Sequence, residues 1–107
     1  MQIPWSTIDK KIAQSIAEPV DIETRQPVSG GCINHAYALR GPRAGFFVKI
    51  NSSQRVDMFA AEFAGLNELR KSKTLRVPKP YSFAVVDGNA FLAMELLNLS
   101  AGDSSSM

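Results

Sequence analysis

Two residues of this sequence, Lys49 and Glu62, have types and positions that call for a partner. Lys49 is the one charged residue in the apolar run 46–50, which has the pattern of a β-strand. Glu62 lies further along, where apolar side chains recur with helical spacing, and at 100° per residue it falls inside the apolar stripe. A carboxylate held among core side chains costs on the order of several kcal/mol unless a cation or hydrogen-bond donors meet it. We therefore predict an ion pair between the strand lysine and the helix glutamate.

Such a pair suits the positioning of nucleotide phosphates. The ammonium group of Lys49 would hold phosphate oxygens as a point charge, and the carboxylate of Glu62 would fix its direction. Two plainer readings stay open. Lys49 can be a solvated lysine on the face of a strand, and Glu62 can reach water past the edge of the stripe.

The segment 29–34 is a second candidate for a phosphate site. Its consecutive glycines lie between two expected strands and would let the backbone approach a ligand closely, while its polar ends add hydrogen-bonding atoms. The segment is neither Gly-x-x-x-x-Gly-Lys-Ser nor a full Gly-x-Gly-x-x-Gly, and an ordinary hairpin uses the same residues. The segment supports a phosphate site mainly because Lys49 and then Glu62 follow it along the chain. Its residues are Ser29, Gly30, Gly31, Cys32, Ile33 and Asn34.

Three further features carry weaker signals. Cys32 is the single cysteine, so it excludes an internal disulfide, and with His35 alone it cannot form a closed metal site. In a glycine loop its thiol would be partly exposed and redox-reactive, unless it is simply an inert small side chain. His35 fits a plain strand histidine. A run of cations at the end of the helix expected over residues 52–73 and in the loop after it fits a solvated helix end and loop, or contacts to an anionic substrate or a lid. The run consists of Arg70, Lys71, Lys73, Arg76 and Lys79.

Length and composition bound the class of protein. The chain has 107 residues, 45% of them hydrophobic, which is the profile of one small soluble domain and leaves no room for a second. The net charge of +2 is too small to indicate a nucleic-acid or membrane binder. Neither a signal peptide nor a membrane span is recognisable. The single cysteine fits a reducing compartment, so we expect a cytoplasmic protein.

The elements that would position these residues follow from the spacing of apolar side chains. Isoleucines recur every four residues from Ile8 to Ile16, which predicts a short amphipathic helix that Pro19 ends. Ser6 and Asp9 are placed as a capping box at the start of this helix.

The remainder of the chain alternates between strand and helix patterns. Residues 22–28, 35–40 and 46–51 alternate as three antiparallel strands, and Pro27 places the first at an edge or an end. Helical spacing over residues 52–73 predicts the core helix, with an apolar stripe of Val56, Phe59, Phe63, Leu66 and Leu69. Residues 82–86 and 90–97 then flank Asp87-Gly88-Asn89, a strong hairpin turn signal.

Five segments together resemble the fructosamine kinase (ketosamine kinase) family, a branch of the protein-kinase-like and aminoglycoside-phosphotransferase-like enzymes. The resemblance covers nearly the whole chain. It implies an α+β fold like the amino-terminal lobe of a protein kinase, with a five-stranded antiparallel sheet, one core helix and an N-terminal helix. The segments are Val28-Ser29-Gly30-Gly31-Cys32-Ile33-Asn34, Phe47-Val48-Lys49-Ile50-Asn51, Met58-Phe59-Ala60-Ala61-Glu62 with Gly65-Leu66, Leu75-Arg76-Val77-Pro78-Lys79-Pro80, and Phe91-Leu92-Ala93-Met94-Glu95-Leu96-Leu97.

The resemblance also implies roles for individual residues. Residues 29–34 would cover the nucleotide, Lys49 would match the phosphate-binding lysine, and Glu62 would match its helix partner. Met94 would occupy the gatekeeper position, and Glu95, Leu96 and Leu97 would form a hinge that offers main-chain groups to adenine.

The expected reaction is phosphorylation of ketosamines, adducts of sugars with amines or protein lysines, which leads to protein deglycation. The resemblance implies ATP and Mg²⁺ as cofactors. It also implies a redox-linked homodimer through Cys32.

The chain departs from the family pattern in length. Members carry a helical lobe with a His-Gly-Asp loop and a later metal-binding Asp, whereas the only histidine here, His35, is followed by Ala36. We expect residues 1–99 to form the nucleotide-binding lobe. Residues 100–107 should lead toward a C-terminal lobe that is absent from the chain. Without that lobe, the chain should be inactive. The alternatives are an aminoglycoside or other small-molecule phosphotransferase, and a non-catalytic pseudokinase fragment.

Overall fold

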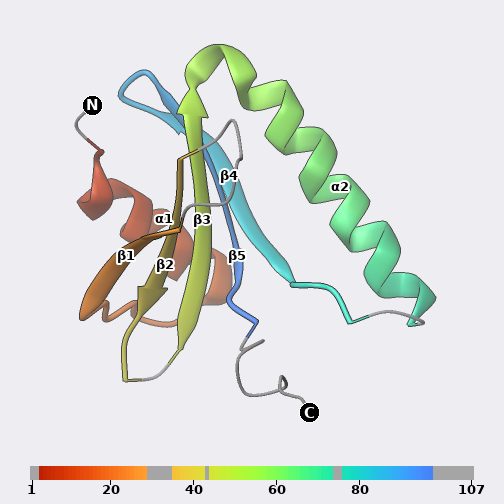
Figure 1. The fold of residues 1–107 in the computed structure, drawn as a ribbon, viewed down its shortest axis with the longest axis horizontal. Helices are drawn as coiled ribbons and strands as arrows, with labels where there is room; N and C mark the ends of the chain where they lie inside the picture. Colours follow the sequence, from red (N-terminus) through yellow and green to blue (C-terminus); the bar gives the residue numbers. More distant parts are fainter. Residues whose placement is uncertain (1–2, 29–34, 43, 74–75, 98–107) are drawn as a thin grey trace.

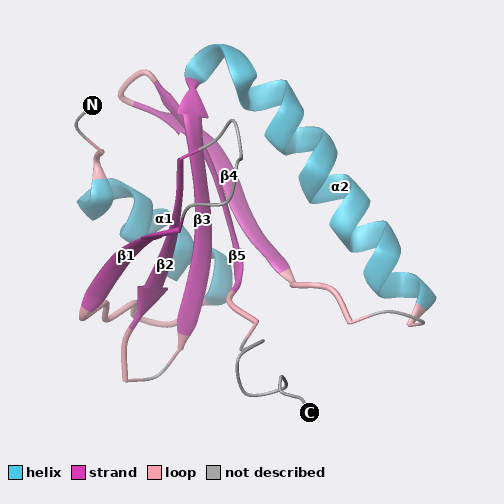
Figure 2. Cartoon of the chain, viewed as in Figure 1, coloured by secondary structure: helices cyan, strands magenta, loops and turns pink. Residues whose placement is uncertain are grey.

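The structure, a computed structural model, describes residues 3–28, 35–42, 44–73 and 76–97. Figures 1 and 2 show a twisted sheet with one helix on each side. None of the described helices is long and apolar enough to cross a membrane. In chain order the elements are α1 (Trp5–Ile16), β1 (Thr24–Val28), β2 (His35–Arg40), β3 (Gly45–Ser52), the short 3-10 helix η1 (Ser53–Arg55), α2 (Val56–Ser72), β4 (Pro80–Val86) and β5 (Asn89–Glu95).

The sheet has five strands in the order β1-β2-β3-β5-β4, and every neighbouring pair is antiparallel. The predicted α+β class and the five-stranded antiparallel sheet are therefore confirmed. Strand β1 lies at one edge, where Pro27 is tolerated because a missing N–H costs least there.

Each face of the sheet packs against one helix. Ile8 and Ile12 of α1 are fully buried in one cluster, whose strand members include Phe46 and Phe91. Phe59 of α2 is fully buried in a second cluster on the other face, where it packs with Ala90, Leu92 and Met94 of β5. Because β5 is interior to the sheet and covered on both faces, its residues from Ala90 to Met94 are all buried.

The predicted hairpin between β4 and β5 is confirmed in detail. Val86 pairs with Asn89, which leaves Asp87 and Gly88 as a two-residue turn. Both have positive φ, 51° and 81°, as a type I′ turn requires.

Three expectations about the elements were wrong. Ser6 and Asp9 do not form a capping box: α1 has Pro4 at its N-cap without a side-chain cap, because the Asp9 carboxylate pairs with Arg25 instead. Strand β5 ends at Glu95 and does not run on to residue 97, because the antiparallel ladder with β3 ends there.

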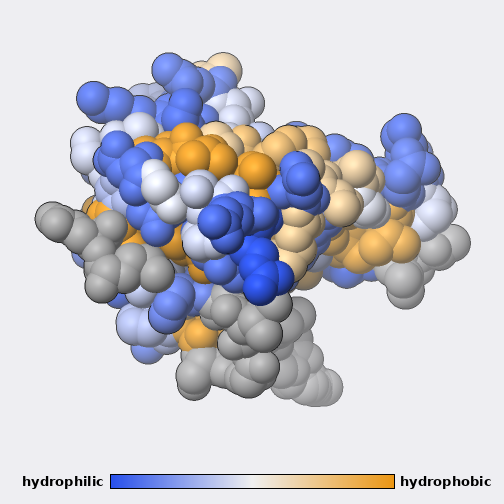
Figure 3. Space-filling model, turned by 90° about the horizontal axis from the view of Figure 1, so that it is seen from above, coloured by the Kyte–Doolittle hydropathy of each residue, from blue (hydrophilic) through white to orange (hydrophobic). Residues whose placement is uncertain are grey.

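The third correction concerns α2. Leu69 belongs to the apolar stripe by its spacing, yet it is 45% exposed, because the end of the helix diverges from the sheet (Figure 1). Val28, Phe83 and Val85 are also large apolar residues on the surface. Figure 3 shows such apolar areas between hydrophilic ones on one side of the molecule. Residues 98–107 lie outside the described residues, so the division at residue 99 stays a prediction.

Candidate functional site

Lys49 and Glu62 form the predicted ion pair. The ammonium nitrogen Nζ of Lys49 donates a hydrogen bond to Oε2 of Glu62 at 2.6 Å. The side chains are 22% and 31% exposed, so each group keeps contact with solvent beside its partner. The pairing is confirmed, and the roles assigned to the two residues stay predictions.

The alternation of β3 explains why these groups meet. Phe46, Val48 and Ile50 belong to the cluster on the α1 side, so Lys49 and Phe47 face α2. In α2, Glu62 follows the buried Phe59 by three residues and therefore lies on the same face of the helix. The fold thus brings a strand lysine and a helix glutamate together at the surface of the second cluster.

A cavity of about 420 Å³ lies beside this pair, within the size range of small-molecule sites. Its walls are mainly apolar, while the Lys49–Glu62 pair, Arg40 and Glu95 supply charge. It is lined by Val28, Ala38, Arg40, Phe47, Lys49, Glu62, Leu66, Pro78, Met94, Glu95, Leu96 and Leu97.

Interactions within the chain restrict the polar groups at one end of the cavity. The N–H of Glu95 donates to the carbonyl of Lys79 at 2.8 Å, and the N–H of Leu96 donates to the carbonyl of Gly45 at 3.3 Å. The Glu95 carboxylate accepts from Arg76 and from the N–H of Lys79. A ligand recognised by main-chain groups here has to use others, such as the N–H of Leu97.

Comparison with known proteins assigns the chain to a family. A sequence profile described as fructosamine kinase matches residues 4–107. The chain belongs to the fructosamine kinase family.

Relatives of known name support the same assignment. A Synechocystis protein named "Probable ketoamine kinase" is 39% identical over 103 residues, covering 96% of this chain and 35% of that protein. A rice protein named protein-ribulosamine 3-kinase, chloroplastic, is 35% identical over 83 residues, covering 75% of this chain and 24% of its own length. The chain therefore spans about a third or less of these relatives.

A solved structure agrees with the fold. The crystal structure of a Haemophilus somnus protein named "Putative fructosamine-3-kinase" superposes with a TM-score of 0.81 at 29% identity. The match covers 88% of this chain and 32% of that one.

Within this fructosamine kinase fold, the cavity brings together six of the residues that the sequence singled out. They come from β3, from α2 and from the end of β5 with the residues after it: Lys49, Glu62, Met94, Glu95, Leu96 and Leu97. The candidate loop, Ser29, Gly30, Gly31, Cys32, Ile33 and Asn34, lies outside the described residues, so its role and that of Cys32 stay predictions.

Sequence reasoning did not assign Val28, Ala38, Leu66 and Pro78 to the cavity, although it singled out the apolar residues Met94, Leu96 and Leu97. Two signals were available for this set. Helical spacing places Leu66 one turn after Glu62, and strand alternation places Ala38 on the same face as its pairing partner Phe47. Among the described residues there is no cluster of three His, Cys, Asp or Glu side chains that could hold a metal ion.

Proposed function

We propose that this chain is the ATP-binding lobe of a ketosamine kinase. The complete enzyme would transfer the γ-phosphoryl group of ATP to a sugar hydroxyl of a fructosamine or ribulosamine adduct, on a small amine or a protein lysine. Phosphorylation of such adducts starts protein deglycation. The observation that carries the proposal is the Lys49–Glu62 pair, 2.6 Å apart, beside an apolar cavity that ends at residues 94–97.

The apolar part of the cavity suits a nucleobase. The side chains of Val28, Ala38, Leu66 and Met94 would enclose the flat faces of adenine and exclude water from them. Met94 is only 4% exposed, so it would form a fixed inner wall. The main chain at residues 95–97 would supply polar contacts to the edge of the base.

The charged part of the cavity suits phosphates. Lys49 would hold phosphate oxygens through its ammonium group, and Glu62 would keep that group pointing in one direction. In such enzymes, positive charge that is already in place stabilises the negative charge that develops on the phosphate in the transition state. This stabilisation accounts for a large share of the rate acceleration. Residues 29–34 would cover the phosphates from the β1–β2 connection.

Transfer itself needs groups beyond these. The hydroxyl oxygen of the sugar attacks the γ-phosphorus, the bond to the bridging oxygen breaks, ADP leaves, and a base takes the hydroxyl proton. We assign the base and the Mg²⁺ ligands to the remainder of the complete enzyme and not to the described residues. ATP supplies the phosphoryl group.

The substrate class rests on the family and on the names of the relatives. We expect the complete enzyme to phosphorylate fructosamine and ribulosamine derivatives of lysine and to leave an aminoglycoside unmodified. Transfer from radiolabelled ATP to each substrate, with Lys49→Met as the inactive control, measures this directly. Transfer to the aminoglycoside alone would replace the ketosamine assignment, and transfer to none of them would favour a non-catalytic role.

A further inference from the structure

The sequence Pro78-Lys79-Pro80 leads into strand β4. Because proline has no N–H, Lys79 carries the only main-chain donor of these three residues. Glu95 of β5 meets both main-chain polar groups of Lys79. Its own N–H donates to the carbonyl of Lys79 at 2.8 Å, and its carboxylate oxygen Oε1 accepts from the N–H of Lys79 at 3.2 Å.

The other carboxylate oxygen of Glu95 adds a second attachment to the same segment. Nη2 of Arg76 donates to Oε2 of Glu95 at 3.1 Å. The Arg76 side chain is 76% exposed, so water screens this ion pair and weakens it. The Glu95 side chain is only 32% exposed, and a charged acceptor strengthens a hydrogen bond. The bond from the N–H of Lys79 is therefore the stronger of the two.

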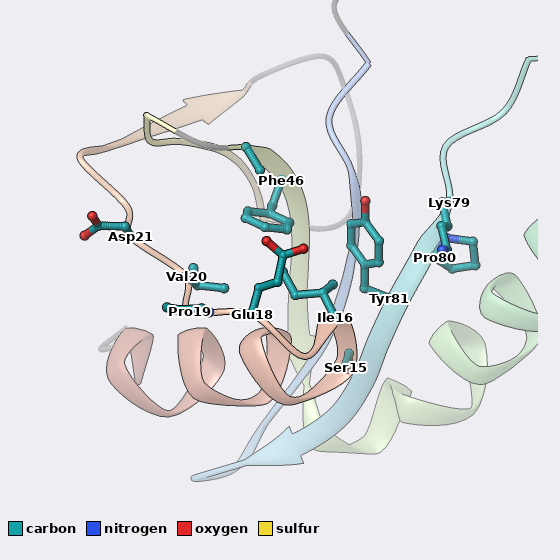
Figure 4. A pocket seen from close by; sticks show the side chains of 11 residues that line it. Ser15, Ile16, Glu18, Pro19, Val20, Asp21, Phe46, Lys79, Pro80 and Tyr81 are labelled. Atoms are coloured by element: carbon teal, nitrogen blue, oxygen red, sulfur yellow. The ribbon is translucent and has the colours of Figure 1, made fainter.

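This segment contributes to the walls of two cavities. Pro78 lines the cavity beside the Lys49–Glu62 pair. A second cavity, of about 430 Å³, lies between the end of α1 and the starts of β3 and β4 (Figure 4). Several of its lining residues are polar, and none of them lines the first cavity. They are Ser15, Ile16, Glu18, Pro19, Val20, Asp21, Ala44, Phe46, Lys79, Pro80 and Tyr81.

The charge of Glu95 also reaches Tyr81 in β4. Burial raises the pKa of the Tyr81 phenol, with a smaller contribution in the same direction from the Glu95 carboxylate and an opposing one from Arg70. This effect agrees with the two hydrogen bonds in placing the Glu95 carboxylate at the start of β4.

The residues after Glu95 complete the same end of the first cavity. Leu96 and Leu97 line it, and the N–H of Leu96 donates to the carbonyl of Gly45 at 3.3 Å. That bond attaches Leu96 to β3, while the bonds of Glu95 attach the segment of Pro78 to β5. The width of the cavity between Pro78 and the two leucines therefore depends on Glu95.

We propose that Glu95 is a positioning residue for the nucleotide: through its hydrogen bonds to the segment before β4, its carboxylate holds Pro78 at the distance from residues 96–97 that the base requires. This inference rests on the function proposed above. Both carboxylate oxygens already accept hydrogen bonds from the chain, so Glu95 acts through Pro78. Release of the segment would widen this end of the cavity and weaken ATP binding, while the Lys49–Glu62 pair keeps its geometry for transfer.

Steady-state kinetics of the complete enzyme, with ATP and a fructosamine derivative of lysine, test the inference. Glu95→Ala removes both side-chain contacts and should raise the KM for ATP about fivefold, the change that one net hydrogen bond produces. The kcat and the KM for the ketosamine should stay within about twofold of the wild type, because the phosphate site is unaltered. A merely structural role would instead lower the apparent kcat through loss of folded enzyme.

A conservative variant separates the hydrogen bond from the ion pair. Glu95→Gln keeps an oxygen that can accept from the N–H of Lys79, so it should bring the KM for ATP back to within about twofold of the wild type. Glu68→Ala is the matched control. Glu68 also pairs with a cation at 3.1 Å, but its side chain is 73% exposed and it lines neither cavity, so the KM should not change.

The outcomes distinguish this inference from the proposed function. If the wild type saturates with ATP and Glu95→Ala has the same KM, the positioning role is overturned and the proposed function stands. A KM in Glu95→Gln as high as in Glu95→Ala, or a rise of equal size in Glu68→Ala, also overturns it. Absence of ATP-dependent transfer in the wild type would overturn the proposed function and the positioning role together.

Discussion

The Lys49–Glu62 pair contributes little to stability. Their side chains are partly exposed, and pairs of this kind stabilise a fold by only about 0–1 kcal/mol after screening by water. The described buried side-chain polar atoms all have partners, so the fold does not depend on this pair to satisfy a buried group. Substitution here should therefore change chemistry while leaving the fold intact.

The raised pKa of Tyr81 predicts that the stability of the fold falls at alkaline pH. Because its folded pKa is raised above the ordinary value of about 10, its contribution to stability is full below that value and is lost as pH rises through the folded pKa. We expect the free energy of unfolding to fall more steeply above about pH 10 in the wild type than in Tyr81→Phe. Urea unfolding of both proteins between pH 8 and pH 11.5, values chosen to span that transition, measures it. Parallel curves would show that Tyr81 is not the group responsible.

At the scale of elements, Gly41 sets how closely the segment before β1 approaches the β2–β3 turn. A Cβ at this position would collide with the carbonyl oxygen of Asp21, a backbone atom that cannot move aside as a side chain can. We expect Gly41→Ala to lower the free energy of unfolding by about 1–3 kcal/mol.

Gly65 is the matched control for this substitution. It lies in α2 with open space where its Cβ would be, so Gly65→Ala should stabilise the protein by up to about 1 kcal/mol through helix propensity. Urea unfolding of the two variants should give opposite signs. Equal effects would mean that the backbone approach at Gly41 is not a constraint.

The side chain of Arg25 connects the edge strand β1 to α1. Arg25 makes two hydrogen bonds to Asp9, at 3.0 and 2.6 Å, and its guanidinium lies 4.7 Å from the ring centre of Trp5. We expect Asp9→Asn to raise amide exchange in β1 about fivefold, which corresponds to about 1 kcal/mol of local stability. Hydrogen exchange followed by mass spectrometry reports it.

The control for this prediction is an ion pair with little shielding from water. Lys71 and Glu68 pair at 3.1 Å with side chains 74% and 73% exposed, so Glu68→Gln should leave exchange unchanged. If both substitutions change exchange alike, the Arg25 contact is not what anchors β1.

Local patterns made the five strands, the β4–β5 hairpin, the two helices and the Lys49–Glu62 pair predictable from the sequence, whereas the pairing of β3 with β5 was not. Glu62 stood out because a charge fell inside an apolar stripe, and Lys49 because it interrupted an apolar strand. Contacts between separate segments had no such signal. The Asp9–Arg25 pair, the approach of Gly41 to Asp21 and both cavities depend on how the sheet and helices pack, which spacing along the chain does not encode.

At the scale of the whole molecule, the sheet separates two cavities with different chemistry. One face holds the Lys49–Glu62 pair and an apolar cavity, and the other holds a cavity between the end of α1 and the starts of β3 and β4. Since the chain spans about a third or less of the relatives compared with it, the proposed transfer reaction is tested in the complete enzyme.

The most direct test of the central claim is a double-mutant cycle on phosphoryl transfer with Lys49→Met and Glu62→Gln. We predict that Lys49→Met lowers kcat/KM at least about a hundredfold, that Glu62→Gln lowers it less, and that the double variant is no worse than Lys49→Met alone. The free energy of unfolding should change by no more than about 1 kcal/mol in each. Unchanged transfer in Lys49→Met, or strictly additive losses in the double variant, would contradict the account.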